Sequence, residues 1–489
     1  MINLVKRLLN YKYSEYLILL AILVFGFTLR LYKIESPIAD WHSWRQADTA
    51  SVTRNFVDQG INLLYPTYHD ISSIQTGSYN PRGYRFVEFP LYNFIHAILT
   101  KSIPFLTLEV WGRLLSAIFA CSSALFIFLI AKDLIDKKTG ILAAFFFLFI
   151  PYNIYFSRVI LPEPLAICLG LAAIWIFILF IKTEKYAYLY LSALVFALSM
   201  LVKPFTFFYS VALIYLLWKK YGFGKLLDNG KLLIRLSIAM SIALLPFFVW
   251  RIWVNQHPTG IPHFNWAFNG DKIRFRPAFW RWIFGERLGY LILGIWGIVP
   301  FIYGILKKPK NFFPHFFFLG GILYVITFAT ASVRHDYYQT FLIPAVSLIL
   351  ACGTIYFWES KEFNRIFSRL LLIFSILMML GIGAYQVKEY YKINHPEIIA
   401  AGQALDQIAQ RDDLVVASYN GDTAFLYQTK RFGWPVVEES FATLIKKGAK
   451  YFVSVNFTDP DVAYLSERYK TVKKTNTYII IDLASPIKK

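Results

Sequence analysis

The sequence has 489 residues, of which 57% are hydrophobic and only 16% charged, and its mean hydropathy is +0.48. Soluble globular proteins carry about 25% charged residues, so this composition excludes a water-soluble enzyme over most of the length. The 46 Phe, 32 Tyr and 13 Trp agree with a polytopic membrane protein, because aromatic rings gather at the two bilayer interfaces. The net charge of +20 does not indicate nucleic-acid binding, since cytoplasmic loops of membrane proteins are rich in Lys and Arg.

Eleven apolar stretches are candidates for membrane-spanning helices, although the fifth and sixth are short and share the interruption at Lys203-Pro204. They cover about residues 14–32, 109–131, 140–157, 164–181, 187–202, 205–218, 231–250, 288–306, 314–331, 338–357 and 369–386. The apolar stretch 89–105 is instead predicted to be an interfacial helix on the outer face. If it crossed the membrane, every later lysine-rich loop would face outward, against the positive-inside rule.

Basic residues predict the orientation of these spans. With the N-terminus in the cytoplasm, the inner side holds most of them, including Lys6, Arg7, Lys12, Lys132, Lys137, Lys138, Lys182, Lys185, Lys219, Lys220, Lys225, Lys231, Lys307, Lys308, Lys310, Lys361, Arg365 and Arg369. The short outer loops hold only Arg158, Lys203 and Arg334. The first apolar run has no small-residue cleavage site after it, so we expect a retained helix. The asymmetry predicts that the C-terminal region is extracytoplasmic.

The predicted fold class is mainly α: a polytopic helical bundle of about eleven spans with a small C-terminal α/β extracytoplasmic domain. We expect a membrane module over residues 1–386, with outer loops at 33–108 and 251–287, and a soluble domain over 387–489. The tail alternates helix-like and strand-like segments, which is typical of an α/β domain. These are helices at 398–411 and 440–447 and strands at 414–419, 451–456 and 478–483.

A dense polar cluster follows the first span. It runs from Asp40 through His42, Arg45 and Asp48 to Arg54. A carboxylate in such a cluster can act as a general base if its surroundings keep it poised for proton transfer. The structural alternative is a capped interfacial helix in which Asp48 or Thr49 caps and the arginines reach toward the membrane surface.

Two more polar groups interrupt the apolar stretches. Arg158 and Glu163 share a very short outer loop, where Glu163 could be a helix cap or a second functional carboxylate. Lys203 precedes Pro204 between two apolar runs, and its ammonium could reach toward the membrane surface or bind a phosphate as a point charge.

A further cluster, Arg334-His335-Asp336-Tyr337-Tyr338, leads into the span that contains Pro344. The fork of an arginine suits phosphate oxygens, whereas the two tyrosines fit an interfacial aromatic belt. In the loop 251–287, basic and aromatic residues alternate, which favours an amphipathic helix on an anionic surface and would equally suit the phosphate end of a lipid-linked ligand.

The sequence has no recognisable metal or disulfide pattern. The three cysteines lie within apolar runs, and no pair of histidines has a zinc-type spacing. Asp40, Asp48 or Glu163 could bind a divalent metal, but their spacing in the sequence does not predict a metal site. The sequence therefore does not determine the cofactor.

The order of these clusters resembles the membrane glycosyltransferases of the GT-C fold. The resemblance covers about residues 10–386 and rests on the acidic first loop, Glu88-Phe89-Pro90-Leu91-Tyr92, Arg113, Arg158-x4-Glu163, Lys203-Pro204, His335-Asp336-Tyr337-Tyr338 and Pro344. The chain is most similar to the bacterial family 39 relatives of protein O-mannosyltransferases and to the lipid A aminoarabinose transferases. Some bacterial members also carry a soluble tail.

This resemblance implies a transferase at the outer face of the cytoplasmic membrane. Its donor would be a polyprenyl-phosphate sugar, hexosyl or pentosyl, and its acceptor a lipid, glycan or protein hydroxyl, with inversion at the anomeric carbon. The family's early acidic residue matches Asp40, but many relatives have a second acid directly after it. Here that position is Trp41, so the base could also be Asp48.

The resemblance further implies roles for the other polar residues. Glu163 matches the family's second acidic position. Donor-phosphate contacts are implied for Arg158, Lys203, Arg334 and His335, and other substrate contacts for His42, Arg45, Tyr337 and Tyr338. Two alternatives remain: a transporter or flippase of lipid-linked sugars, and an envelope glycan assembly protein that works through its tail.

Overall fold

The computed structural model describes residues 14–222, 224 and 228–487. The predicted inner basic residues Lys6, Arg7, Lys12 and Lys225 therefore lie outside the described residues. The chain divides into two compact units. The helical unit comprises Met1–Ile34, Leu114–Trp250 and Phe264–Glu389, and the mixed unit comprises Glu35–Arg113, Arg251–His263 and Tyr390–Lys489.

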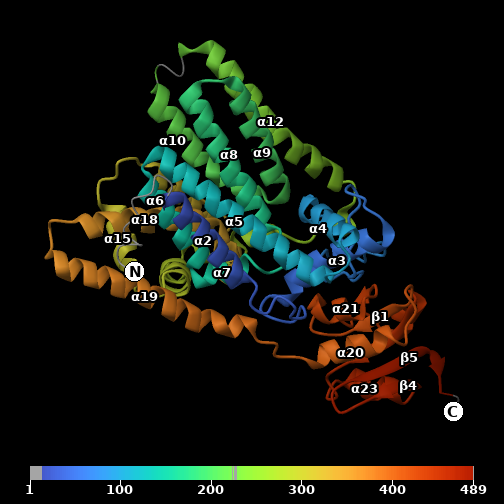
Figure 1. Ribbon diagram of the computed structural model, residues 1–489. Helices are drawn as coiled ribbons and strands as arrows, with labels where there is room; N and C mark the ends of the chain where they lie inside the picture. The colour runs from blue at the N-terminus through green and yellow to red at the C-terminus, as the bar shows by residue number, and fades with distance from the viewer. Residues whose placement is uncertain (1–13, 223, 225–227, 488–489) are drawn as a thin grey trace. The chain divides into compact units, whose positions relative to one another are not determined.

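The helical unit contains all or part of a series of largely apolar helices (Figure 1). They are α2 (Ser14–Arg30), α5 (Leu108–Leu134), α6 (Lys137–Phe149), α7 (Pro151–Phe156), α8 (Glu163–Thr183), α9 (Tyr186–Val202), η1 (Pro204–Tyr209), α10 (Ser210–Tyr221), α12 (Gly230–Val254), α13 (Asn265–Asn269), η3 (Ile273–Phe275), α14 (Pro277–Trp280), η4 (Arg281–Ile292), α15 (Ile298–Leu306), α16 (Phe313–Thr327), α17 (Ala329–Arg334), η5 (Asp336–Leu342), α18 (Ile343–Glu359), α19 (Arg365–Val387) and η6 (Lys388–Tyr391). Helix α8 packs along α9, and α18 packs against α6 and α15.

Each of the eleven predicted apolar stretches contains helix, but several are interrupted. The stretch 140–157 divides at Pro151, whose ring is accommodated at the start of α7. The stretch 288–306 divides where Gly294 and Ile295 take positive φ angles of 49° and 63°. Among the described residues, five helices are long and apolar enough to cross a membrane: α5, α8, α12, η5 with α18, and α19 with η6.

The mixed unit contains two helices from the predicted first outer loop and the C-terminal α/β segment. The first two are α3 (Ser43–Gln59) and α4 (Leu91–Ser102), which pack on each other. The unit also contains the short η2 (Pro258–Gly260) from the second predicted outer loop. The C-terminal helices are α20 (Glu397–Asp406), α21 (Thr423–Thr429), α22 (Phe441–Lys446) and α23 (Pro460–Ser466). The apolar stretch 89–105, which we expected to be an interfacial helix, is helical as α4.

A five-stranded sheet forms the C-terminal part of the mixed unit. Its strands are β1 (Leu414–Ala417), β2 (Gly433–Trp434), β3 (Ala449–Ser454), β4 (Tyr469–Lys474) and β5 (Ile479–Pro486). Their order is β2-β1-β3-β5-β4, with parallel pairing of β1 to β2 and β3 and antiparallel pairing among β3, β5 and β4. The predicted α/β tail is therefore present, with β2, β4, α21 and α23 in addition to the predicted elements.

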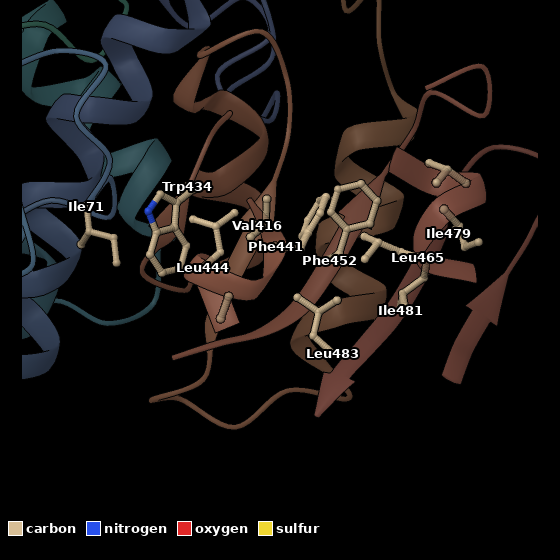
Figure 2. Packing of buried hydrophobic residues seen from close by; sticks show 12 residues of the cluster. Ile71, Val416, Trp434, Phe441, Leu444, Phe452, Leu465, Ile479, Ile481 and Leu483 are labelled. Atoms are coloured by element: carbon tan, nitrogen blue, oxygen red, sulfur yellow. The ribbon is translucent and has the colours of Figure 1, made fainter. Parts of the chain in front are cut away.

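The predicted first outer loop contributes to this sheet. The amide of Ile71 donates to the carbonyl of Gly433 at 2.9 Å, and the amide of Gly433 donates to the carbonyl of His69 at 2.9 Å. The Ile71 side chain is only 2% exposed and belongs to the same apolar cluster as Trp434 and Val416 (Figure 2). Residues 69–71 thus lie along β2, and the hydrophobic core of the sheet includes a residue of the loop.

Candidate functional site

Asp40 lies in a turn just before α3. Its side chain is 6% exposed, and its Oδ1 accepts a hydrogen bond from Nε2 of Gln46 at 2.7 Å. Between them, His42 adopts a left-handed backbone with φ of 54° as the residue that precedes α3. This turn brings the carboxylate back over the first turn of the helix, so Asp40 is fixed by a side chain of the helix that it precedes.

Asp48 lies inside α3 and is fully buried. Its Oδ2 forms an ion pair with Arg85 at 2.7 Å, and its Oδ1 accepts from the hydroxyl of Thr423 at 2.7 Å. The structural alternative in which Asp48 or Thr49 caps a helix is wrong, because both residues lie within α3. Both carboxylate oxygens of Asp48 are engaged within the protein.

The other charged residues of the first cluster also form buried pairs. Arg45 contacts Glu88 at 2.5 Å, with side chains 4% and 10% exposed. Arg54 contacts Glu109 at 3.1 Å, and its guanidinium carbon lies 3.7 Å from the centre of the Tyr427 ring. Their partners come from distant parts of the mixed unit, so these arginines hold its segments together.

Two buried carboxyls near Asp48 have raised pKa values. Burial is the main cause at Asp70, where the pKa rises to about 6 although the amide of Ser72 donates to the carboxylate. Burial likewise raises the pKa of Asp422 to about 6, the negative charge of Asp48 adds to the shift, and His42 opposes it. The region around Asp48 is therefore a low-dielectric, carboxylate-rich part of the unit.

In the helical unit, Glu163 and Lys203 form a buried ion pair. Their charged atoms are 2.9 Å apart, and the side chains are 1% and 8% exposed. Glu163 is the first residue of α8, so a helix N-terminus favours its negative charge. Lys203 lies in the extended connection between α9 and η1, where Pro204 begins the 3-10 helix. The predicted interruption at Lys203-Pro204 is therefore present.

Aromatic rings connect this ion pair to the cluster around His335. The Lys203 ammonium lies 5.9 Å from the Phe205 ring, and the Phe205 ring lies 5.5 Å from that of Tyr338. The His335 ring in turn lies 6.2 Å from Tyr338 and 5.7 Å from Tyr337. Lys203, Phe205, His335, Tyr337 and Tyr338 therefore form one contiguous group, in which Phe205 is the only member that was not a predicted site residue.

The two arginines of the predicted donor site differ in their surroundings. Arg158 is fully buried and donates to the carbonyl of Lys33 at 2.6 Å. The Arg334 side chain is 56% exposed and forms a bidentate salt bridge with Asp271, in which Nε donates to Oδ2 at 2.8 Å and Nη2 donates to Oδ1 at 2.6 Å. Any phosphate that used Arg334 would therefore share it with a carboxylate.

The predicted site residues fall into two sets, one in each compact unit. Asp40, His42, Arg45 and Asp48 belong to the mixed unit, and Arg158, Glu163, Lys203, Arg334, His335, Tyr337 and Tyr338 belong to the helical unit. Sequence reasoning did not predict the partners of these residues. Gln46 donates to Asp40, Arg85 and Thr423 contact Asp48, and Asp271 pairs with Arg334. A buried Asp48 predicts that some cation must neutralise it, but only the three-dimensional contact identifies Arg85.

No group of three or more His, Cys, Asp or Glu side chains suited to a metal ion occurs among the described residues. The divalent metal that the sequence analysis left as an alternative thus has no preformed cluster in the described part of the chain.

The chain is similar to known glycosyltransferases in sequence pattern and in fold. The family model of the dolichyl-phosphate-mannose-protein mannosyltransferases matches residues 88–253. The structure of ArnT from Cupriavidus metallidurans bound to undecaprenyl phosphate aligns with a TM-score of 0.65 and 10% identity, over 96% of this chain and 98% of that one. The resemblance to the GT-C membrane glycosyltransferases is confirmed.

Two further solved structures share this fold. ArnT from Cupriavidus metallidurans in the apo state gives a TM-score of 0.61 with 12% identity, over 95% of this chain and 97% of that one. The archaeal oligosaccharyltransferase AglB from Archaeoglobus fulgidus, in complex with an inhibitory peptide and a dolichol-phosphate, gives 0.55 with 11% identity, over 96% and 74%. No curated protein sequence matches the chain. The apolar helices and the family model together identify a multi-pass membrane protein.

Proposed function

We propose that this protein transfers a sugar from a polyprenyl-phosphate donor to a hydroxyl group of a lipid, glycan or protein acceptor. The observation that carries the proposal is the family-model match over residues 88–253. That range includes Arg158, Glu163 and Lys203, three buried charged residues that the sequence analysis selected as site candidates. The fold shared with ArnT, whose structure contains undecaprenyl phosphate, supports a lipid-linked donor.

Asp40 is our candidate for the general base. The acceptor hydroxyl would give its proton to the Asp40 carboxylate while its oxygen bonds to the anomeric carbon. The bond from that carbon to the phosphate oxygen breaks, and its electron pair leaves with polyprenyl phosphate. Such a single displacement inverts the anomeric centre. Asp40 is our choice over Asp48, because it matches the family's early acidic position, whereas Asp48 lies inside α3 in a buried ion pair with Arg85.

The cations of the helical unit are our candidates for the donor phosphate. A leaving phosphate gains negative charge, which fixed positive groups in a water-poor site stabilise strongly. Lys203 and Arg158 are both buried. His335 contacts Tyr338 of the same aromatic group, and Arg334 precedes His335 in the chain. We assign Glu163 to the machinery as the partner that orients the Lys203 ammonium, and Tyr337 and Tyr338 to substrate contact.

His42 and Arg45 are proposed to assist at the acceptor side. His42 immediately precedes the helix that carries Gln46, and Arg45 is held by Glu88. His42 lies two residues after Asp40 in the chain, whereas Arg45 is positioned by its ion pair with Glu88.

The proposed setting is the cytoplasmic membrane, with the reaction at its outer face. We propose eleven spans, a cytoplasmic N-terminus, a membrane module over residues 1–386 and an extracytoplasmic domain over 387–489. The distribution of basic residues supports this orientation. Accessibility labelling of single cysteines, introduced at Lys138 and at Lys470, tests it: we expect labelling from opposite sides of the membrane.

The transfer itself is tested with purified protein in detergent. Given a polyprenyl-phosphate sugar and a cell-envelope extract, the protein should release polyprenyl phosphate and form a glycosylated product. A protein that moves intact lipid-linked sugar across vesicles without cleaving it is a transporter, and that result would refute the proposal.

A further inference from the structure

The short segment that carries Asp40 is held by residues from the C-terminal part of the chain. The side-chain amide of Gln428 donates to the carbonyl of Ile38 at 2.9 Å, two residues before Asp40. On the other side, the amide of Trp41 donates to the carbonyl of Tyr390 at 3.1 Å. The rings of Trp41 and Tyr390 are stacked, with centres 5.0 Å apart and planes 6° apart. The chain is therefore held on both sides of Asp40, at Ile38 and at Trp41, by residues more than three hundred positions away.

The helix that fixes the Asp40 side chain is also held by the C-terminal part. Thr423 is 4% exposed, and its hydroxyl lies 2.7 Å from Oδ1 of Asp48 and 3.2 Å from the carbonyl of Trp44. Asp48 and Trp44 lie on either side of Gln46 in α3, and Gln46 donates to Asp40. The hydroxyl of Thr423 therefore fixes the turn of α3 that presents Gln46.

A second contact fixes the following turns of α3. The Arg54 guanidinium packs on the ring of Tyr427 and donates to its carbonyl at 2.8 Å. The hydroxyl of Tyr427 in turn donates to Glu109 at 2.5 Å. Thr423 and Tyr427 are four residues apart in α21 and so lie on one face of that helix. Helices α21 and α3 pack against each other, and both of these residues contact side chains of α3.

We infer that helix α21 is a positioning element for the active site, and that Thr423 and Gln428 are the residues through which it sets the position of Asp40. This inference rests on the proposed role of Asp40 as the base. A base must lie within hydrogen-bond reach of the proton that it removes, and a misplacement of about 1 Å can cost roughly a hundredfold in rate. The C-terminal segment thereby acts on the reaction without contacting substrate.

The experiment compares four variants of the full-length protein with the wild type. Thr423→Val keeps the shape of the side chain and removes the hydroxyl. Thr423→Ser keeps the hydroxyl and removes a methyl group. Thr471→Val makes the same exchange on β4, where the side chain is exposed, and is the matched control. Gln428→Met removes the other proposed donor.

Two measurements are made on each variant. Hydrogen–deuterium exchange over residues 36–50 reports the order of the segment independently of turnover. Steady-state kinetics of polyprenyl phosphate release give kcat and KM for the donor. We expect Thr423→Val and Gln428→Met to increase exchange over 36–50 and to lower kcat about tenfold, with KM changed less than about twofold. Thr423→Ser and Thr471→Val should keep wild-type values in both measurements.

The outcomes separate this inference from the proposed function. Unchanged exchange and unchanged kcat in Thr423→Val would overturn the inference. An equal loss in Thr423→Val and Thr423→Ser would also overturn it, because the hydroxyl would then not be the group that matters. If the wild-type protein releases no polyprenyl phosphate while exchange over 36–50 still rises in Thr423→Val, the proposed function fails and the positioning of the segment stands.

Discussion

The hydroxyl of Thr423 lies 2.7 Å from the carboxylate of Asp48, although the two residues are 375 positions apart in the chain. Both side chains are buried. With residues 69–71 paired to β2 and Ile71 in the core of the sheet, this contact makes the first loop and the C-terminal segment one structural unit. The stability of that unit should therefore respond to changes on either side of the contact.

Removing the Asp48 carboxylate should destabilise the protein strongly. Asp48→Ala leaves the buried guanidinium of Arg85 without its counter-ion, and breaking one side of a buried pair costs about 3–5 kcal/mol. Asp58→Ala is the matched control, because Asp58 lies on the same helix in an exposed pair with Arg411 at 3.6 Å. Such surface pairs contribute about 0–1 kcal/mol. Denaturant unfolding in detergent measures both, and equal effects would contradict the assignment of Asp48 as a buried anchor.

The apolar contact between the loop and the sheet should contribute independently. Ile71→Ala removes a side chain that is 2% exposed in the core beside Trp434 (Figure 2), and we expect a loss of about 2–5 kcal/mol. Ile74→Ala, three residues further on at 44% exposure, should change stability by less than about 1 kcal/mol. Limited proteolysis should also cut the loop faster in Ile71→Ala than in Ile74→Ala. Similar cleavage of both variants would argue against a loop that is part of the core.

Asp70 should make the protein less stable as the pH rises. Its folded pKa of about 6 lies above the ordinary value of 3.8, so between these values the folded state binds more protons than the unfolded state. Stability attributable to Asp70 is therefore greatest below the unfolded pKa of 3.8, falls as the pH rises to about 6, and is lost above that value. The difference of about 2.2 pKa units corresponds to up to about 3 kcal/mol.

This pH dependence is measured by thermal unfolding between pH 4 and 7.5. Asp70→Asn should flatten the decrease in stability over pH 4 to 6. Asp412→Asn, at an exposed position of the same unit, should leave the profile as in the wild type. A profile that is unchanged in Asp70→Asn would show that this carboxyl does not titrate in that range.

The Lys203–Glu163 pair should affect donor recognition. Lys203→Met removes a buried ammonium, and hydrogen bonds to charged groups contribute about 1.5–3 kcal/mol. We therefore expect kcat/KM for the donor to fall by about tenfold to a hundredfold. Lys219→Met, at an exposed lysine near the end of α10, should have no effect. If Lys203→Met and the double variant with Glu163→Gln are both as active as the wild type, the pair has only a structural role.

Hydropathy alone located the helices of this protein, because apolar length is a strong constraint on chains that enter a membrane. It could not predict the interruptions at Pro151 and Gly294, which depend on local backbone geometry. In the tail, the alternating pattern identified β1, β3 and β5. It missed β4, whose sequence Tyr469–Lys474 is exposed and rich in lysine, and β2, which has only two residues.

The sequence predicted which residues make up the candidate site, but not which of them contact one another. The sequence identified Asp40, Asp48, Glu163 and Lys203 as charged residues that lie within or close to apolar stretches. It gave no sign that Glu163 and Lys203, forty positions apart, would form an ion pair, or that Asp48 would bind Thr423. Such pairings depend on tertiary packing, and a single sequence carries no periodic signal for them.

The base assignment is tested most directly by Asp40→Asn, which keeps the size of the side chain and its capacity to pair with Gln46 while removing the negative charge. Release of polyprenyl phosphate from a polyprenyl-phosphate sugar is measured for the wild type, Asp40→Asn and Asp58→Asn, with thermal unfolding to verify the fold. We expect kcat to fall by about 100- to 10,000-fold in Asp40→Asn, the contribution typical of a general base, while Asp58→Asn retains wild-type turnover. Wild-type turnover in a folded Asp40→Asn protein would contradict the central claim.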